Sequence, residues 1–221
     1  MAVVEGGTSG ALVGVGAESQ SAMHVTARPD PAGTLGHYRT SHRASIIAVQ
    51  KANSRLFELQ NAHATNIIIL HAIRMEWIQT ANHTAAILDS IDIFRCTSFS
   101  AVDTTQTVTP VISKLRTSFA TAGANVRGIT VAGHVDGMTG GSLVKDANPL
   151  RQLGQWLLAA VPTGSVVVPM VDVFSPDVAS GESPLILAQN EGIIVENRVL
   201  LGAAGGSAFS IDVEWSEVTA Y

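Results

Sequence analysis

The chain has 221 residues, of which 46% are hydrophobic and 14% are charged, against about 25% charged in an average soluble protein. Its formal net charge is −5 at pH 7, and its 13 lysines and arginines are scattered singly along the sequence. This distribution argues against nucleic-acid binding, which needs clustered cations to neutralise phosphates. The shortage of charge instead predicts a surface reserved for neighbouring subunits, as in an obligate oligomer or an assembled lattice. A large core would account for part of it.

Residues 1–36 are rich in glycine, alanine and serine and show little hydrophobic periodicity. Ordering such a segment costs about 1–2 kcal/mol per residue of backbone, and it has too few large apolar side chains to offset that cost alone. We therefore predict an extended N-terminal arm that docks onto an adjacent subunit; the alternative is that it lies along its own domain. The apolar contacts of the arm would come from Val3, Val4, Leu12, Val13 and Val15.

We expect no targeting segment at the N-terminus, because it lacks a basic region and carries an acid at Glu5. The longest apolar runs, such as Trp156 to Val161, are far shorter than the roughly 20 residues of a membrane span. We expect a soluble chain that is not exported by a signal peptide and does not bind membranes.

From His37 onward the pattern is typical of β-structure. Ser45 to Lys51 predicts a strand or a short helix, and a second short apolar segment covers 55–60. The longest segment begins at Asn66, and it is apolar on both faces near its start, which predicts a strand between two layers or under a partner. One face of this strand would carry Ile67, Ile69, His71, Ile73, Met75 and Trp77.

Further short segments follow at 85–94, 126–132 and 165–174, the last of which contains Pro169 and is therefore an edge strand or a broken one. Between them lie a Ser/Thr-rich connection over 97–109 and a glycine-rich loop over 133–141. The segment Ser113–Phe119 is either a short helix or a turn into a strand. Pro149 to Ala159 shows one helical turn of leucine spacing, formed by Leu150, Leu153 and Leu157.

The C-terminal segment alternates strictly between apolar and polar residues, which marks a strand with one buried and one solvated face. We predict a core built on this strand, with Ile67, Ile69 and Ile73 contributing from the long strand. The buried face of the C-terminal strand would carry Phe209, Ile211, Val213 and Trp215.

Few side chains form a pattern that indicates chemistry. The single cysteine, Cys96, excludes an intrachain disulfide and a multi-cysteine zinc site, and its strand-like context predicts a small buried hydrophobe. Neither His63 and His71 nor His37 and His42 have metal-ligand spacing. Phosphate binding by the glycine-rich loops is poorly supported, because they lack the lysine that ends a phosphate loop. The tryptophans Trp77, Trp156 and Trp215 lie in apolar patterns and are expected to be core or interface anchors.

Three acidic pairs are candidates for a general acid and base: Asp89 with Asp92, Glu182 with Glu191, and Glu214 with Glu217. Catalysis would need two carboxylates that converge across a cleft, which sequence spacing alone does not establish. We therefore predict no catalytic residues, no cofactor and no metal site, and a protein that is not an enzyme.

Residues 184–197 (PLILAQNEGIIVEN) and 209–218 (FSIDVEWSEV), together with Ser113-Lys-Leu-Arg-Thr-Ser118, carry a resemblance to virion-associated proteins of tailed phages. The resemblance extends more loosely over 66–120 and does not include the arm. It implies a bacteriophage virion structural protein, a capsid decoration or cement protein that stabilises the particle through inter-subunit contacts. The implied partners are other virion proteins, foremost the major capsid protein, and further copies of the chain. The protein would be part of a virion assembled in the host cytoplasm.

Two other functions stay open, namely a phage tail or neck component and, in a different class, a carbohydrate-binding module. About eight β-like segments separated by turn signals indicate an all-β sandwich or barrel. Together with the resemblance, they favour a jelly-roll-like β-sandwich domain over 37–221, preceded by the extended N-terminal arm over 1–36.

Overall fold

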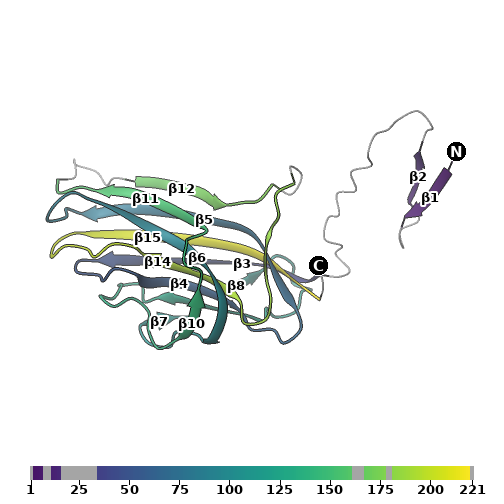
Figure 1. Cartoon of the computed structure of the whole chain (residues 1–221), viewed down its shortest axis with the longest axis horizontal. Helices are drawn as coiled ribbons and strands as arrows, with labels where there is room; N and C mark the ends of the chain where they lie inside the picture. Colours follow the sequence, from purple (N-terminus) through teal and green to yellow (C-terminus); the bar gives the residue numbers. More distant parts are fainter. Residues whose placement is uncertain (1, 7–10, 16–33, 161–166, 178–180, 220–221) are drawn as a thin grey trace.

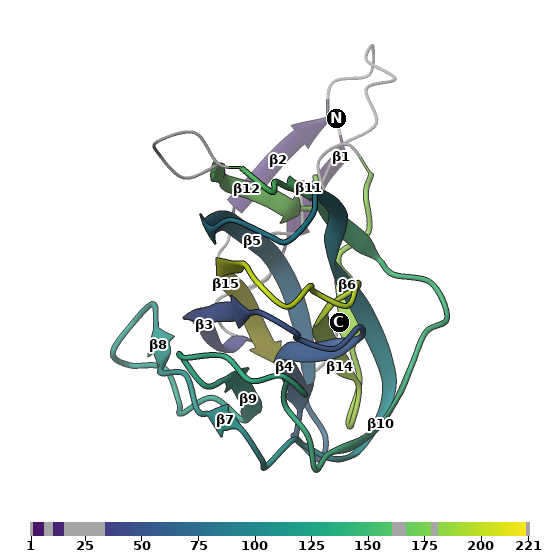
Figure 2. The ribbon, with the colours of Figure 1, turned by 90° about the vertical axis from the view of Figure 1, so that its left-hand side faces the viewer.

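The computed structural model describes residues 2–6, 11–15, 34–160, 167–177 and 181–219. Within these ranges the chain forms strands and turns without a helix, so none of the described segments is a long apolar helix that could span a membrane. Two antiparallel sheets pack face to face (Figure 1, Figure 2). The predicted all-β sandwich is confirmed; its finer description as a jelly roll stays a prediction.

The strands have the following bounds in chain order: β1 Ala2–Gly6, β2 Ala11–Val15, β3 Thr34–Ile47, β4 Ser54–Asn61, β5 Ile67–Ala81, β6 Ile87–Ala101, β7 Thr107–Val108, β8 Ile112–Lys114, β9 Ala124–Ile129, β10 Ser142–Lys145, β11 Arg151–Leu157, β12 Val167–Phe174, β13 Leu185–Leu187, β14 Gly192–Asn197 and β15 Gly206–Val218.

One sheet has seven strands in the order β10-β6-β14-β4-β9-β7, with β11 also paired to β6. The other has six strands in the order β12-β5-β15-β3-β8, with β13 also paired to β5. From β3 to β6 the chain changes sheet at every connection, so that strands adjacent in sequence lie in different layers (Figure 2). Each long strand can therefore bury one face against the opposite sheet.

The C-terminal strand β15 lies in the middle of the six-stranded sheet, between β5 and β3. Its four alternating residues Phe209, Ile211, Val213 and Trp215 are all fully buried in the main core, as predicted. Burial of one such side chain stabilises the fold by roughly 1.5–3 kcal/mol. The period-two pattern was therefore a reliable guide to which face of this strand is buried.

The prediction for β5 is only partly correct, because a β-bulge interrupts the alternation. In its pairing with β15, Glu214 lies opposite Ala72 and Trp215 lies opposite Leu70, so that His71 has no residue opposite it. The extra residue reverses the faces of the strand on either side of it. Ile73 belongs to the main core as expected, but Ile67 and Ile69 do not; their even-numbered neighbours Ile68 and Leu70 take their place.

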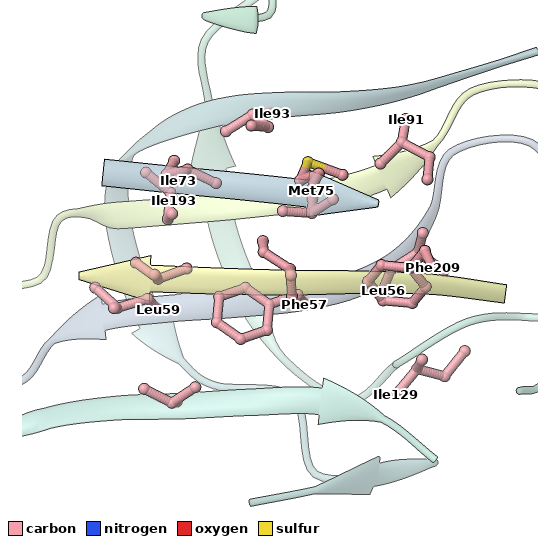
Figure 3. Close-up of a cluster of buried hydrophobic side chains, with 14 of the residues drawn as sticks. Leu56, Phe57, Leu59, Ile73, Met75, Ile91, Ile93, Ile129, Ile193 and Phe209 are labelled. Carbon is pink, nitrogen blue, oxygen red and sulfur yellow. The ribbon is translucent and has the colours of Figure 1, made fainter. Parts of the chain in front are cut away.

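The centre of the main core lies between the two sheets (Figure 3). Side chains from β4, β6 and β14 face those from β5 and β15 across this space. The labelled residues, all buried, are Leu56, Phe57, Leu59, Ile73, Met75, Ile91, Ile93, Ile129, Ile193 and Phe209.

Three local expectations are corrected or sharpened. Pro149 to Ala159 does not form a helical turn but contains strand β11, which pairs residue by residue with β6. Ser45 to Lys51 holds the end of strand β3 followed by a turn, and Ser113–Phe119 holds the end of β8 followed by a turn. Pro169 lies in β12, the edge strand of the six-stranded sheet, where the register shifts between Val168 and Val171.

The segment expected to form the arm contains a hairpin. Strands β1 and β2 pair antiparallel, with Val4 opposite Val13 and Glu5 opposite Leu12. An isolated two-stranded hairpin is at best marginally stable in water. The first strand of the sandwich begins at Thr34, so it includes the last residues of the range assigned to the arm.

Candidate functional site

The largest exposed aromatic side chain lies on the outer face of the seven-stranded sheet. Trp156 on β11 is 58% exposed, and Leu88, directly opposite it on β6, is 55% exposed. Gly154 is two residues away on the same strand, and a methyl group added there would meet one described atom within 4 Å, Asp89 O at 3.9 Å. Trp156 is therefore not a core residue, whereas Trp77 and Trp215 are fully buried. We call Trp156 and Leu88 the apolar pair.

The outer face of the six-stranded sheet is charged and open to water. Arg39 on β3 pairs with Asp212 on β15, and Arg74 on β5 pairs with Asp172 on β12 at 2.8 Å. Arg74 also lies 3.8 Å from Glu214. Because most of these groups are partly exposed, water and salt screen their attraction.

Two histidines meet on this open face. The rings of His37 and His71 have centroids 4.9 Å apart, and His71 Nε2 lies 2.7 Å from Ser216 Oγ. Burial lowers the pKa of His71, the positive field of His37 lowers it further, and Glu214 opposes this by raising it. Ser216 is buried, so this arrangement is a packed polar cluster and not an accessible nucleophile.

His63, which lacks metal-ligand spacing to His71, lies elsewhere and binds Glu217. The Glu217 carboxylate is buried and lies 2.6 Å from His63 Nε2. It also accepts hydrogen bonds from the backbone N–H groups of Gly123 and Ala124 and from Trp215 Nε1. This fully bonded carboxylate ties the end of β15 to two connections and has a structural role.

The outer face of the seven-stranded sheet differs, because two further segments of the chain pack against part of it. Residues 102–106 and 138–145, here called the cover, pack against this face: the Asp103 N–H donates to Glu58 of β4, and residues 142–145 form β10, the edge strand paired with β6. The backbone N–H groups of Thr104 and Thr105 both donate to the Thr139 carbonyl, and Met138 N–H donates to the Arg55 carbonyl at 2.9 Å. The two parts of the cover are thus joined to each other and to β4.

Two carboxyl groups are buried beneath the cover. Glu58 on β4 and Asp103 in the cover are both 0% exposed. Glu58 Oε1 accepts a hydrogen bond from the Asp103 backbone N–H at 2.8 Å, whereas Glu58 Oε2 and Asp103 Oδ2 have no hydrogen-bond partner among the described residues. Asp103 Oδ1 accepts hydrogen bonds from Gly141 N–H at 2.7 Å and from the Arg55 guanidinium at 2.8 Å.

These surroundings raise the pKa of both acids. Burial and then the negative charge of Asp103 raise the pKa of Glu58 to about 7, against the weaker opposing effects of the Asp103 N–H, Arg55 and Arg127. Burial also raises the pKa of Asp103, opposed by Arg55 and by the Gly141 N–H. Removing an acid from water disfavours its charged form, and a second acid nearby adds to that effect.

The glycine-rich loop of the sequence is explained by the path of the cover. Gly137 and Gly140 adopt positive φ angles of 69° and 93°. At Gly141 an added methyl group would lie 2.7 Å from Asp103 Oδ1, so glycine is needed for close approach. These glycines fit the loop against β4 and Asp103, and this packing accounts for them without a phosphate.

A second apolar cluster lies beside the buried acids, on the same outer face. It consists of the buried side chains of Phe94, Cys96, Phe99 and Ile194, with Leu143 of the cover packed against them. Ile194 lies opposite Glu58 on β4 and opposite Phe94 on β6. Cys96 is buried as predicted, and burial, followed by the charges of Glu196 and Glu58, raises its pKa to about 12.

The acidic pairs of the sequence do not converge. Asp89 faces the space between the sheets, and Asp92, three residues along the strand, faces outward. Glu214 lies on the open face, whereas Glu217 is buried.

In the remaining acidic pair, Glu191 binds Arg95 at 2.8 Å and Glu182 accepts the Asp177 N–H. Among the described residues no group of three or more His, Cys, Asp and Glu side chains is placed to hold a metal ion.

The residues proposed for the arm interface lie in the β1–β2 hairpin, where the structure describes the backbone register alone. The side chains of Val3, Val4, Leu12, Val13 and Val15 are outside the described part, so their role as contacts stays a prediction. The buried acids were missed by sequence reasoning. The available signal was Glu58 itself, an acid within the apolar run Leu56 to Leu59.

Comparison with protein-family models, with curated proteins and with solved structures finds no match to this chain.

Proposed function

We propose that the chain is a structural protein of a tailed-phage virion, a decoration or cement protein that stabilises the particle through contacts between subunits. The observation that carries the proposal is the apolar pair, an exposed Trp156 beside an exposed Leu88 on a rigid sheet. Tryptophan is enriched among the residues that dominate binding energy at protein interfaces. The sequence resemblance and the charged fraction of 14% support the same proposal.

The apolar pair lies at one side of the seven-stranded sheet, on strands that pair along seven consecutive positions. A side chain anchored in this way loses little conformational entropy when a partner covers it. We assign the contact with the major capsid protein, or with a second copy of the chain, to this surface. The N-terminal hairpin is the second contact, because a two-stranded sheet gains stability when it packs against another surface.

The first test replaces the apolar pair and measures binding to particles that lack the protein. We expect Trp156→Ser and Leu88→Ser each to weaken binding about ten-fold or more, because each removes exposed apolar area at the proposed contact. Leu115→Ser is the matched control, since Leu115 is 49% exposed and lies away from β11. Full-strength binding by both apolar-pair variants would refute this docking surface.

The second test concerns the arm. Removal of residues 2–33 is expected to leave the thermal stability of the free chain unchanged and to lower its copy number in purified virions. Truncated protein that reaches the wild-type copy number, in particles equally resistant to heat, would exclude an interface role for the arm. Antibody labelling of virions distinguishes a capsid position from the alternative position in the tail or neck.

A second candidate function is carbohydrate binding, which the exposed Trp156 favours specifically. An exposed, flat indole on a strand is a surface on which a sugar ring can stack. Glycan-array binding that is lost in Trp156→Ser, with particle incorporation unchanged, would establish this function in place of the structural one.

A further inference from the structure

The charges around Glu58 and Asp103 do not balance. Arg55 is the cation at hydrogen-bonding distance from this pair, and it binds Asp103 Oδ1. Arg127 lies further off and donates to Thr109 Oγ1 and the Val126 carbonyl. One of the two buried carboxylates is thus compensated by a hydrogen-bonded cation and the other is not, which favours keeping a proton on the pair.

The other charged groups that face this region already have partners. Glu196 on β14 binds Lys145 of the cover, and the Lys145 ammonium also lies 4.1 Å from the centre of the Phe94 ring. Asp92 on β6 accepts hydrogen bonds from Ser90 and Gln152 and lies 3.7 Å from Arg198. Cys96 on β6 is neutral at ordinary pH.

We propose that Glu58 and Asp103 form a proton-binding site that fastens the cover, and that loss of the shared proton loosens the cover and exposes the apolar cluster of Phe94, Cys96, Phe99 and Ile194. The proposal does not depend on the proposed function.

The geometry explains why the proton controls the cover. Asp103 belongs to the cover and its backbone N–H binds Glu58 of the sheet, so the pair is a direct link between the two layers. When both carboxylates are charged, they repel each other at a site shielded from solvent, and the nearest relief is to move Asp103 outward. The hydrogen bond from Gly141 to Asp103 would carry the second part of the cover with it.

The consequence is an apolar surface that opens as pH rises. Ile194 is the direct cross-strand neighbour of Glu58, and the side chain of the cover that packs against its cluster is Leu143, opposite Phe99 in the pairing of β10 with β6. The pairing of β10 with β6 has two register irregularities, so this strand has fewer regular ladder bonds to hold it. The cover is therefore the part of this face most able to detach locally.

The single cysteine of the chain is a natural reporter, because Cys96 is fully buried in this cluster. The test measures the rate at which a dipyridyl disulfide labels Cys96 in the full chain from about pH 5 to about pH 8, followed by pyridinethione absorbance. Wild type is compared at each pH with Glu58→Gln, which keeps the acceptor for Asp103 N–H but cannot ionise. The wild-type rate divided by the Glu58→Gln rate is free of the intrinsic pH dependence of the thiol, because both proteins share it.

We expect this ratio to rise about ten-fold or more between pH 5 and pH 8. Glu214→Gln, on the open face, is the matched control and should follow the wild-type profile. If Glu58→Gln does not fold, Asp103→Asn takes its place with the same expectation. A ratio that is constant across this range overturns the proposal. So does labelling with the same urea dependence as global unfolding, since the cover would then not open by itself.

Discussion

The two outer faces of the sandwich differ in how far their charged side chains are exposed to water. On the six-stranded sheet, Arg39, Arg74, Asp172 and Glu214 are partly exposed and pair across neighbouring strands. On the seven-stranded sheet, the outward acids Glu58, Asp92 and Glu196 are almost completely buried, and the cover contacts two of them, through the Asp103 N–H at Glu58 and Lys145 at Glu196. Strand alternation therefore determines which way a side chain points, whereas the segments that connect the strands determine whether it is exposed to water.

This distinction changes what each charge contributes. An exposed ion pair is attenuated by water and salt and stabilises a fold by about 1 kcal/mol or less. A buried acid instead carries a large desolvation cost, so its partners and its proton decide whether it is tolerated. The predictions below compare the two faces, beginning with the largest expected effect.

The largest effect is expected from removing the cation of the covered face. Arg55→Met leaves Asp103 and Glu58 buried without the guanidinium that binds Asp103 Oδ1, and it should lower the free energy of unfolding by about 3–5 kcal/mol near neutral pH. The same change on the open face, Arg39→Met, should cost about 1 kcal/mol or less, because Arg39 is 45% exposed. Urea denaturation measures both. Equal losses would show that the cover does not withdraw its acids from water.

The second prediction concerns Asp89, a buried acid between the sheets that is separate from the cover. Its Oδ1 accepts hydrogen bonds from the N–H groups of Ser90 and Val199, whereas Oδ2 has no hydrogen-bond partner in the part of the chain that the structure describes. Burial raises its pKa to about 7, with a smaller contribution from Asp92 and opposition from those two hydrogen bonds. Unfolded aspartate has a pKa of about 3.9.

The sign follows from which state binds the proton. Below about pH 4 Asp89 is protonated in both the folded and the unfolded state, so it does not make stability depend on pH. Between about pH 4 and 7 the folded state alone keeps the proton, so stability falls as pH rises. The free energy of unfolding of Asp89→Asn, relative to that of wild type, should therefore rise by about 2–4 kcal/mol between pH 4 and pH 8. Asp172→Asn, at a carboxylate that is 59% exposed, is the control. A pH-independent difference between Asp89→Asn and wild type would contradict the assignment.

The sequence was sufficient to predict the class of the fold and the buried face of β15, because both depend on local alternation. It was insufficient at β5, where the bulge at His71 exchanges the faces, since a bulge is set by pairing with β15 and not by β5 itself. It also failed at β11. Leucines three and four apart fit a helix, but residue-by-residue pairing with β6 made the segment a strand.

The candidate sites were less predictable than the fold. Trp156 lies in an apolar run, yet it faces outward because its neighbours Gln155 and Leu157 face inward. Glu58 and Asp103 are 45 residues apart, and their contact exists only because the connection after β6 folds back over β4. No spacing rule relates two such residues, so the proton-binding site could be found only from the folded structure.

The third prediction compares two glycines, Gly141 in the cover and Gly154 in the open strand β11. Gly141→Ala would place a methyl group 2.7 Å from Asp103 Oδ1 and 2.8 Å from Asp103 N, which should cost about 1–3 kcal/mol. Gly154→Ala has no atom within 3.9 Å other than Asp89 O at that distance, and should gain about 0.5 kcal/mol, because alanine loses less backbone entropy in a strand. Thermal unfolding of both variants measures the contrast, and losses of similar size would refute it.

The smallest effect is expected on the open face itself, between Arg74 and Asp172. These side chains are 36% and 59% exposed and meet at 2.8 Å across β5 and β12, so water weakens their attraction and each must be immobilised to keep it. A double-mutant cycle with Arg74→Ala and Asp172→Ala should give a coupling free energy of about 0.2–1 kcal/mol at low salt. In about 0.5 M salt the coupling should decrease further, because mobile ions screen exposed charges within a few ångströms. The nearby Glu214, 3.8 Å from Arg74, keeps part of the attraction in the Asp172→Ala variant, which lowers the measured coupling. A coupling above about 2 kcal/mol that is insensitive to salt would mean that this face is shielded from water as well, and the contrast between the two faces would then be lost.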